Sequence, residues 1–344
     1  MNTQPDLLAL YALMLKSRLY EEAITQLWVD GLISGEMHLG TGEEGIIAGV
    51  IAQLHDGDAL AIDHRSTAPM LMRGVDPVLI LKELLGYPDG LCGGMGGHMH
   101  LYSKQHLAAS SGIVGAGGPS AVGFALAAQY LRPGTIAVAF FGEGAMNQGM
   151  LMESINLAAT WKLPVLFVCK DDNWSITTKS DTVTTGTLND RTHFWGVPAE
   201  SVDGRDVSEV WHAANKAVKR AREGKGPSFL RMKCVHFEGH FLGLQTIRIV
   251  RNPLREMPRV AIPLTKSMLK PSGASLRKRI SGLKSVLTSV LSTLRDPRQD
   301  PNNDPVRIAR IALQSDQVRL KAIEDDTKRE VDSIVTLALK EGES

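Results

Sequence analysis

Acidic side chains follow two apolar segments, each at the point where a strand would end. Glu143 comes directly after "TIAVAFFG", and Asp172 and Asn173 follow "PVLFVC". If the two strands are parallel neighbours, these oxygen atoms lie close together and, with diphosphate oxygens, suit an octahedral Mg²⁺. Gly144 and Ala145 offer backbone N–H groups to the same space, ahead of a helix N-terminus that favours phosphate. The spacing is typical of a site for a cation and a phosphate group, although acids also occur at the rims of ordinary βαβ units.

The elements that must hold these residues alternate between strands and helices from about residue 45 to residue 243. Four apolar runs predict strands, namely "ALAI", "TIAVAFFG", "PVLFVC" and "PSFLRMKC". The apolar face of the helix between the middle two is predicted to consist of Met150, Met152, Ile155, Leu157 and Ala158. The alternation indicates an α/β fold with a mostly parallel sheet flanked by helices.

The composition excludes several classes of protein. With 344 residues, 43% of them hydrophobic, the chain is long enough to bury a large core. Lys plus Arg (38) and Asp plus Glu (37) nearly balance, so no overall field would recruit nucleic acid. No apolar segment reaches the roughly 20 residues that a membrane span needs, and the N-terminus lacks signal-peptide features. The three widely spaced cysteines fit reduced thiols, so we expect a cytoplasmic protein.

A family resemblance extends over most of the chain. The segment from Glu143 to Trp174 resembles the thiamin diphosphate motif of the alpha subunits of 2-oxo acid dehydrogenase complexes, which starts with G-D-G and ends in an Asn pair. The segments "HRSTAPMLMRG", "GGMGGHMHLYSK", "GIVGAGGP" and "GKGPSFLRMKCVHFEGH" are also similar to family segments and stand in family order. The resemblance implies the thiamin-diphosphate-binding fold, with thiamin diphosphate and Mg²⁺ as cofactors.

The metal site implied by the resemblance departs from the family pattern at two positions. Glu143 matches the metal-binding aspartate, with an arm one methylene longer. Asp172 matches the metal-binding asparagine and adds a negative charge; two like charges about 4 Å apart cost about 4 kcal/mol at an effective dielectric of about 20. Trp174 would add a backbone carbonyl. Asn173 stays an alternative ligand to Asp172, and Lys170 is a candidate source of compensating charge.

The remaining matched residues are implied to line the cofactor and the substrate. The positions expected to contact the cofactor are His64, Arg65, Gly112, Val114, Gly144, Ala145 and His240. His64 stands beside the diphosphate-binding arginine, where the family usually has a tyrosine. His240 and His38 match active-site histidines and are the predicted catalytic residues. His98 is interpreted as a structural hydrogen-bonding residue, and His236 as an ordinary surface or core residue.

The chain is predicted to comprise three parts. Residues 1–243 form the cofactor-binding domain. Residues 244–303, rich in Arg, Lys, Ser and Pro, are interpreted as a basic, partly helical insertion that packs on its own protein or docks an acidic partner. Residues 304–344 predict two further helices of the same domain, with Asp304 as the N-cap ahead of Pro305.

The activity implied by the resemblance is oxidative decarboxylation of a 2-oxo acid, with transfer of the acyl group to the lipoyl group of an acyltransferase component. Pyruvate is the first choice; acetoin is nearly equal because "FEGHFLG" resembles acetoin-type chains, and branched-chain 2-oxo acids come third. A catalytically silent scaffold is the alternative of another class. A separate beta chain would complete the site in a heterotetramer of two alpha and two beta chains, which would cover the apolar, glycine-dense segment around Met95.

Overall fold

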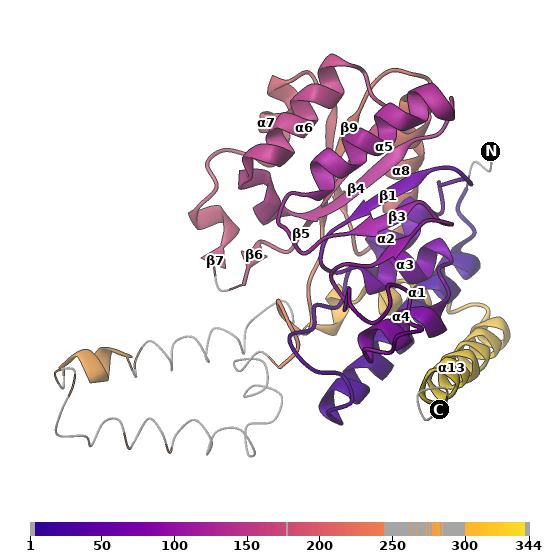
Figure 1. Cartoon of the computed structure of the whole chain (residues 1–344), viewed down its shortest axis with the longest axis vertical. Coiled ribbons are helices and arrows are strands. Elements are labelled where there is room, and N and C mark those ends of the chain that lie inside the picture. The colour runs from indigo at the N-terminus through magenta and orange to yellow at the C-terminus, as the bar shows by residue number, and fades with distance from the viewer. Residues whose placement is uncertain are drawn as a thin grey trace.

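A mostly parallel sheet forms the centre of the computed structural model, which describes residues 4–176, 178–243 and 300–340 and a few positions between 262 and 284. Its strands are β1 (Ala59–Ile62), β2 (Tyr102–Ser103), β3 (Ala108–Ser110), β4 (Ala137–Gly142), β5 (Val165–Asp171), β8 (Ala199–Asp203) and β9 (Ser228–Lys233). They form one seven-stranded sheet in the order β2-β3-β1-β4-β5-β9-β8 (Figure 1). All neighbours are parallel except β2 and β3. The predicted fold class is confirmed.

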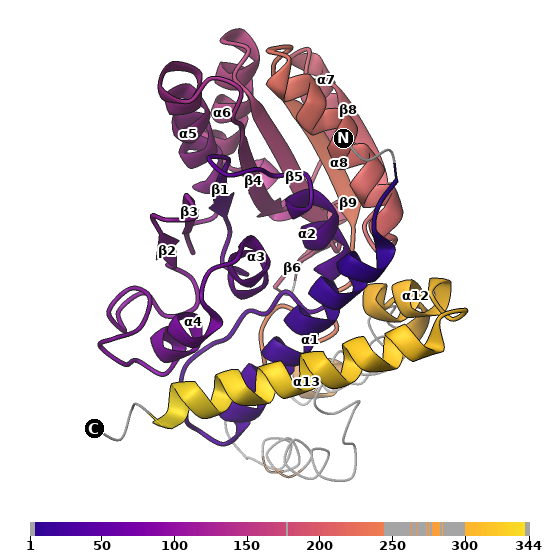
Figure 2. The same cartoon turned by 90° about the vertical axis from the view of Figure 1, so that its right-hand side faces the viewer.

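Helices cover both faces of this sheet. Figure 2 shows α5 (Gly117–Leu131) and α6 (Gly149–Thr160) on one side, and α2 (Glu44–Ile51) and α8 (Val207–Arg222) on the other. Side chains of β4 alternate between the two cores: Ala139 and Phe141 pack in the α5–α6 core, and Val138 and Phe140 in the other. Parallel strands buried on both faces explain why the strand runs read as continuously apolar.

The unit from β4 through α6 to β5 forms where the sequence predicts it, with β4 and β5 parallel neighbours. The predicted apolar face of α6 is wrong in part. Ile155 and Ala158 are buried against α5 and the sheet as predicted, but Met150 is 40% exposed and Leu151 is buried instead. The helix therefore presents a face rotated from the one that its methionines suggested.

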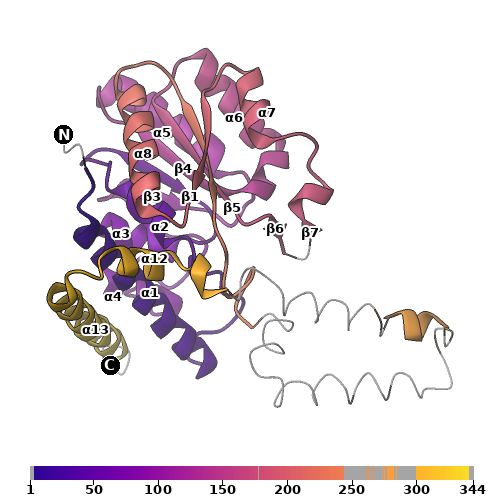
Figure 3. The same cartoon turned by 180° about the vertical axis from the view of Figure 1, so that it is seen from behind.

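An outer layer of helices joins the two ends of the chain. It consists of α1 (Leu7–Val29), α3 (Thr67–Arg73), α4 (Pro77–Leu84), α12 (Pro305–Ala312) and α13 (Gln317–Lys340). In the view from behind, α12 lies below α8 with α13 beside it, and α12 contacts α1 and α2 (Figure 3). Arg18 of α1 donates to Asp304 at 3.0 Å, and Asp304 caps α12 as predicted. The predicted insertion, residues 244–303, lies outside the described residues for most of its length.

Short elements complete the described part of the chain. They are α7 (Leu188–Phe194), the hairpin of β6 (Trp174–Ser175) and β7 (Thr178–Lys179), and the 3₁₀ turns Glu143–Asn147, Ser180–Thr182 and Pro301–Asn303. None of the helices described has the length and hydropathy to cross a lipid bilayer.

The carboxyl ends of the parallel strands meet at one edge of the sheet. The register pairs Gly142 at the end of β4 with Lys170 of β5, and Asp171 at the end of β5 with Lys233 of β9. Segments that follow these strands therefore converge at this edge, where open α/β sheets bind their ligands.

Glu21 of α1 ties two of the converging segments together. Its buried carboxyl group accepts hydrogen bonds from Gly40 N at 2.9 Å, Thr41 Oγ1 at 3.1 Å and Thr67 Oγ1 at 2.5 Å. Thr67 stands at the N-terminal end of α3, so Glu21 holds α3 and the loop before α2 against α1.

Replacing Glu21 with glutamine should reduce the pH dependence of stability. Burial raises the pKa of Glu21 to about 7. An acid with a raised folded-state pKa favours folding in its protonated form, so this contribution is lost as pH rises from about 4.5 to about 7, by at most about 1.4 kcal/mol per pH unit. Urea unfolding at about pH 5 and about pH 7.5 measures the difference. An equal pH dependence in Glu21→Gln and the parent chain would contradict this assignment.

Candidate active site

A cavity of about 460 Å³ lies at the carboxyl ends of β1, β3, β4, β5 and β9. Its volume suits a small-molecule ligand. It is lined by every residue that the sequence assigned to a site, namely His38, His64, Arg65, Gly112, Val114, Glu143, Gly144, Ala145, Asp172, Trp174 and His240. The segments that follow these strands, together with the loop between α1 and α2, thus bring the predicted residues into one space.

Two buried acids face each other in this cavity. Glu143 begins the 3₁₀ turn after β4 and accepts a hydrogen bond from Ser180 Oγ. Burial and then the Asp172 carboxylate raise the pKa of Glu143 to about 7. The next residue is Gly144, and a Cβ there would meet Ser175 Oγ, so this hydroxyl would have to rotate away to make room for a side chain. The two acids form an electronegative corner of the cavity, an arrangement that a divalent cation would relieve.

Asn173 points away from the cavity. Its side chain contacts the turn after β7, where Nδ2 donates to Asp181 Oδ2 at 3.4 Å and Oδ1 accepts from Asp181 N at 3.2 Å. Asp172 lines the cavity instead and accepts a hydrogen bond from Trp174 N at 3.2 Å. Asp172 is therefore better placed than Asn173 to contact a ligand in this cavity.

A series of ion pairs connects Asp172 to residues of neighbouring segments. His236 lies 2.7 Å from Glu43 through Nε2 and 2.8 Å from Asp172 through Nδ1. Lys170 Nζ lies 2.7 Å from Glu43 and 3.0 Å from Asp63. Burial opposes a charged Glu43, but Lys170 and His236 hold the pKa of Glu43 at about 2. We call Asp63, Lys170, Glu43, His236 and Asp172 the charge chain.

Sequence reasoning missed His236, and it also missed Glu43 and Asp63, which line the same cavity. The interpretation as an ordinary surface or core residue is wrong, because His236 is buried between two carboxylates and lines the cavity. Nothing in its local sequence distinguishes it from other histidines. Lys170 offered a detectable signal, since a lone lysine inside an apolar strand must find a buried acid.

His236 should remain protonated at neutral pH, in contrast to its neighbours. Burial and Arg65 lower its proton affinity, but Asp172 and Glu43 raise the pKa of His236 to about 9. A base with a raised folded-state pKa stabilises the fold fully below its unfolded value near 6.5, and this contribution is lost as pH rises through about 9. A histidine-selective NMR titration measures the pKa, and Asp172→Asn should lower it. A His236 that titrates near 6.5 in the parent chain would contradict the assignment.

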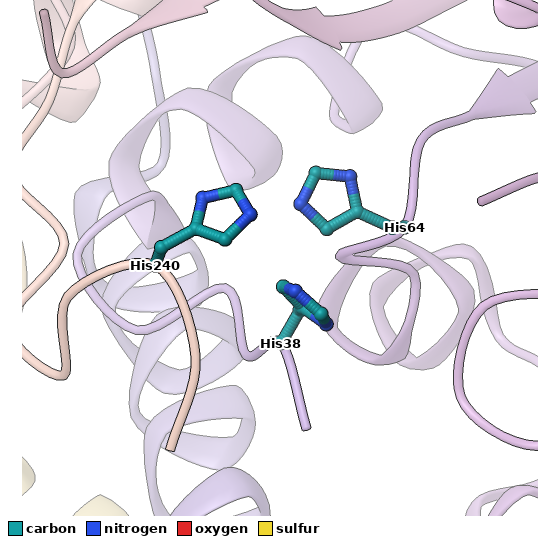
Figure 4. A group of neighbouring side chains, drawn as sticks. All are labelled: His38, His64 and His240. Carbon is teal, nitrogen blue, oxygen red and sulfur yellow. The ribbon is translucent and has the colours of Figure 1, made fainter. Parts of the chain in front are cut away.

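Three other histidines converge on the cavity from separate segments (Figure 4). The ring centroid of His38 lies 4.7 Å from that of His64 and 4.9 Å from that of His240. Burial, followed by the Arg65 cation, lowers the pKa of His38 to about 3 and that of His240 to about 4. His98 supports this group as the predicted structural hydrogen-bonding residue, with Nε2 2.9 Å from His38 Nδ1.

Arg65 joins the segments that carry two of these histidines. Its guanidinium donates to the carbonyl oxygens of Leu39 at 2.5 Å and His240 at 2.8 Å. Leu242 N donates to Met37 O at 2.8 Å between the same segments. Arg65 is 3% exposed, so its charge is held at the cavity wall by backbone carbonyls.

The loop that carries His38 also approaches the segment after β9 very closely. Gly42 has a φ of 103°, and a Cβ there would collide with the carbonyl oxygen of Val235. Only glycine accommodates both this conformation and this contact. The position of His38 relative to His240 is thus determined by backbone packing.

The fold is also found in a solved enzyme structure. Transketolase from Campylobacter jejuni matches with a TM-score of 0.50 and 16% sequence identity, over 98% of this chain and 49% of the transketolase chain. At this identity the likeness shows the fold alone.

This chain belongs to the dehydrogenase E1 component family, whose model matches residues 11–243. The alpha subunit of acetoin:2,6-dichlorophenolindophenol oxidoreductase from Cupriavidus necator is 42% identical over 245 residues, which are 70% of this chain and 74% of the relative. The pyruvate dehydrogenase E1 component subunit alpha from Zymomonas mobilis is 40% identical over 238 residues, which are 68% of this chain and 67% of the relative. The family is thiamin diphosphate dependent, usually with a divalent ion such as Mg²⁺.

Proposed function

We propose that this chain is the alpha subunit of the decarboxylase component of a 2-oxo acid dehydrogenase, with pyruvate as its substrate. The observation that supports this most is that one cavity is lined by all the residues assigned to cofactor, metal and catalysis. The relatives at 42% and 40% identity support an enzyme that handles a small oxo compound.

In this proposal the acid pair and its neighbour hold Mg²⁺. Glu143 and Asp172 contribute carboxylates and Trp174 a backbone carbonyl, which are the hard oxygen ligands that Mg²⁺ prefers. The raised pKa of Glu143 supports a cation here, because a positive charge would offset the burial and the Asp172 repulsion that disfavour its carboxylate. His236 offsets the additional charge of Asp172.

The phosphate end of the cofactor is proposed to face the neighbouring segments. The residues involved are Arg65, His64 and the backbone N–H groups of Gly144 and Ala145, with Gly112 and Val114 along the aminopyrimidine ring. His64 Nε2 is buried without a hydrogen-bond partner among the described residues, so it is available to a ligand. The cofactor, when bound, supplies the carbanion chemistry that attacks an oxo carbon.

His240 and His38 are proposed as the catalytic residues. Both imidazoles line the cavity, and both have a lowered pKa, so they are neutral at pH 7. A neutral imidazole can take up a proton at its free ring nitrogen and return it. For His38 this nitrogen is Nε2, because Nδ1 is engaged with His98.

A beta subunit is proposed to complete the site, in a heterotetramer of two alpha and two beta chains, with a lipoyl-bearing acyltransferase component as acyl acceptor. The glycine-dense segment supports a covered face, since Met95 is 90% and Ile113 is 63% exposed in the single chain. Ile113 also lines the cavity, so a partner over this face would reach the site.

Acetoin is the second candidate substrate, favoured by the 42% identity to the Cupriavidus necator subunit. Both substrates can deliver a two-carbon acyl group, but they release different second products. Pyruvate loses carbon dioxide, whereas acetoin releases acetaldehyde. Product analysis therefore separates the two candidates.

The test is co-expression with the beta chain encoded nearest in the genome, followed by an assay with pyruvate, acetoin and branched-chain 2-oxo acids. Reduction of 2,6-dichlorophenolindophenol reports oxidation without requiring the lipoyl partner. We expect the fastest reduction with pyruvate, together with carbon dioxide. Faster reduction with acetoin and release of acetaldehyde would replace pyruvate by acetoin, and cofactor binding without turnover of any 2-oxo acid would overturn the decarboxylase assignment.

A further inference from the structure

The three converging histidines form a compact set of nitrogen ligands. His38 comes from the loop before α2, His64 follows β1, and His240 follows β9 (Figure 4). Each offers one ring nitrogen, and these atoms all lie within 4.8 Å of one another. Nitrogen ligands of a tetrahedral zinc ion stand roughly 3.4 Å apart, as bonds of about 2.0–2.1 Å require. Small side-chain rotations toward the common space would close the remaining gap.

Two of the three rings, those of His38 and His64, have contacts that suit a metal ligand. The contact between His38 Nδ1 and His98 Nε2, at 2.9 Å, fixes the His38 ring and leaves its Nε2 unengaged by that bond. A histidine bound to metal commonly has its second nitrogen held in this way. His64 Nε2 is buried and lacks a partner in the part of the chain that the structure describes. A buried polar atom without a partner requires an explanation, and a bound ligand provides one.

The ligand type selects the class of ion. Neutral imidazoles suit Zn²⁺ and other divalent transition ions, whereas Mg²⁺ prefers oxygen. His38, His64 and His240 each offer an imidazole nitrogen, and no carboxylate belongs to this set of ligands. The Arg65 cation opposes metal binding, but its guanidinium is directed to the carbonyls of Leu39 and His240 and lies 3.9 Å from Glu43.

We propose that His38, His64 and His240 form a binding site for a divalent transition ion, best matched by Zn²⁺, separate from the Glu143 and Asp172 corner of the same cavity. The proposal of a metal site depends only on the geometry of the three histidines. Its consequence for the enzyme rests on the proposed function: because His64 would also face the cofactor, an ion held by the three histidines excludes that contact. Zn²⁺ should therefore weaken cofactor binding.

Metal binding is tested on the full-length chain without cofactor. Zn²⁺ affinity is measured by calorimetry, and Co²⁺ serves as a spectroscopic probe whose visible absorption reports nitrogen ligation. We expect one Zn²⁺ per chain and at least about a tenfold loss of affinity in His38→Ala, His64→Ala and His240→Ala, since even residues that support a metal ligand contribute 10–100-fold. His64→Tyr keeps an aromatic ring and guards against misfolding; it should show the same loss.

His212→Ala is the matched control, because His212 lies exposed on α8 outside the cavity. It should leave the Zn²⁺ affinity unchanged. Zn²⁺ binding that is equal in the parent chain, His64→Tyr and His240→Ala would overturn the proposal, as would binding that depends on His212.

A second titration separates this proposal from the proposed function. Thiamin diphosphate and Mg²⁺ are titrated into the complex with its beta chain, with and without Zn²⁺. The proposal is supported if Zn²⁺ weakens thiamin diphosphate binding in the parent complex but not in the His64→Tyr complex. If the complex binds Zn²⁺ but never binds thiamin diphosphate, the proposed function is overturned and the metal site is kept. If the complex binds thiamin diphosphate but no Zn²⁺, the metal site is overturned and the proposed function is kept.

Discussion

Replacing Lys170 with methionine should lower the free energy of unfolding by about 3–5 kcal/mol, the scale of leaving a buried charge unpaired. Lys170 and Glu43 are each 1% exposed in their side chains, and Lys170 also pairs with Asp63. Methionine fills a similar volume but leaves both acids without their shared cation. Urea unfolding of the parent chain and of Lys170→Met measures the loss.

Lys216→Met is the matched control. Lys216 pairs with Glu200 at 3.0 Å, but its side chain is 79% exposed and that of its partner 46%. An ion pair in water contributes about 0–1 kcal/mol, so the control should lose little stability. Equal losses in Lys170→Met and Lys216→Met would show that the charge chain does not stabilise the fold.

Replacing Glu143 with alanine should weaken Mg²⁺-dependent binding of thiamin diphosphate by about 1–3 kcal/mol, roughly 5- to 150-fold, the scale of a lost charged contact. The proposed metal ligand is removed, while Asp172 remains with His236 as its partner. Cofactor titration in the complex with the beta chain measures the change. Glu143→Asp, which keeps the charge on the shorter arm typical of the family, should retain most of the affinity.

Two controls keep this experiment interpretable. Glu153→Ala makes the same substitution on an exposed residue of α6 and should not change cofactor binding. Urea unfolding of Glu143→Ala beside the parent chain shows whether the variant keeps its fold. Unchanged cofactor affinity in Glu143→Ala would move the metal site elsewhere. A parent complex with no Mg²⁺-dependent affinity at all would favour the silent scaffold.

The sequence predicted the site where chemistry follows strong local patterns. Continuous apolar runs and a glycine turn located β4, α6 and β5, and acids at strand ends then had to meet because parallel strands share one edge. The sequence also identified Asp304, ahead of Pro305, as the N-cap of α12. These features depend on residues close together in the chain.

The partners within the charge chain could not be predicted in this way. Glu43 and His236 are 193 positions apart, and nothing in either local segment identifies the other. The residue type alone predicts that a buried Lys170 needs an acidic partner. Which acidic residue becomes that partner depends on the packing of the folded chain. The rotated face of α6 has a similar cause, since both the methionines and Leu151 are apolar and only burial separates them.

Acid and base alternate along the charge chain from Asp63 through Lys170, Glu43 and His236 to Asp172. The effect of replacing any member therefore depends on which residues occupy the positions on either side. Such sites show epistasis: a substitution that is harmful alone becomes acceptable when its neighbour changes charge in the opposite sense. The aspartate at position 172 and the histidine at position 236 should accordingly be exchanged together in any redesign of this cavity.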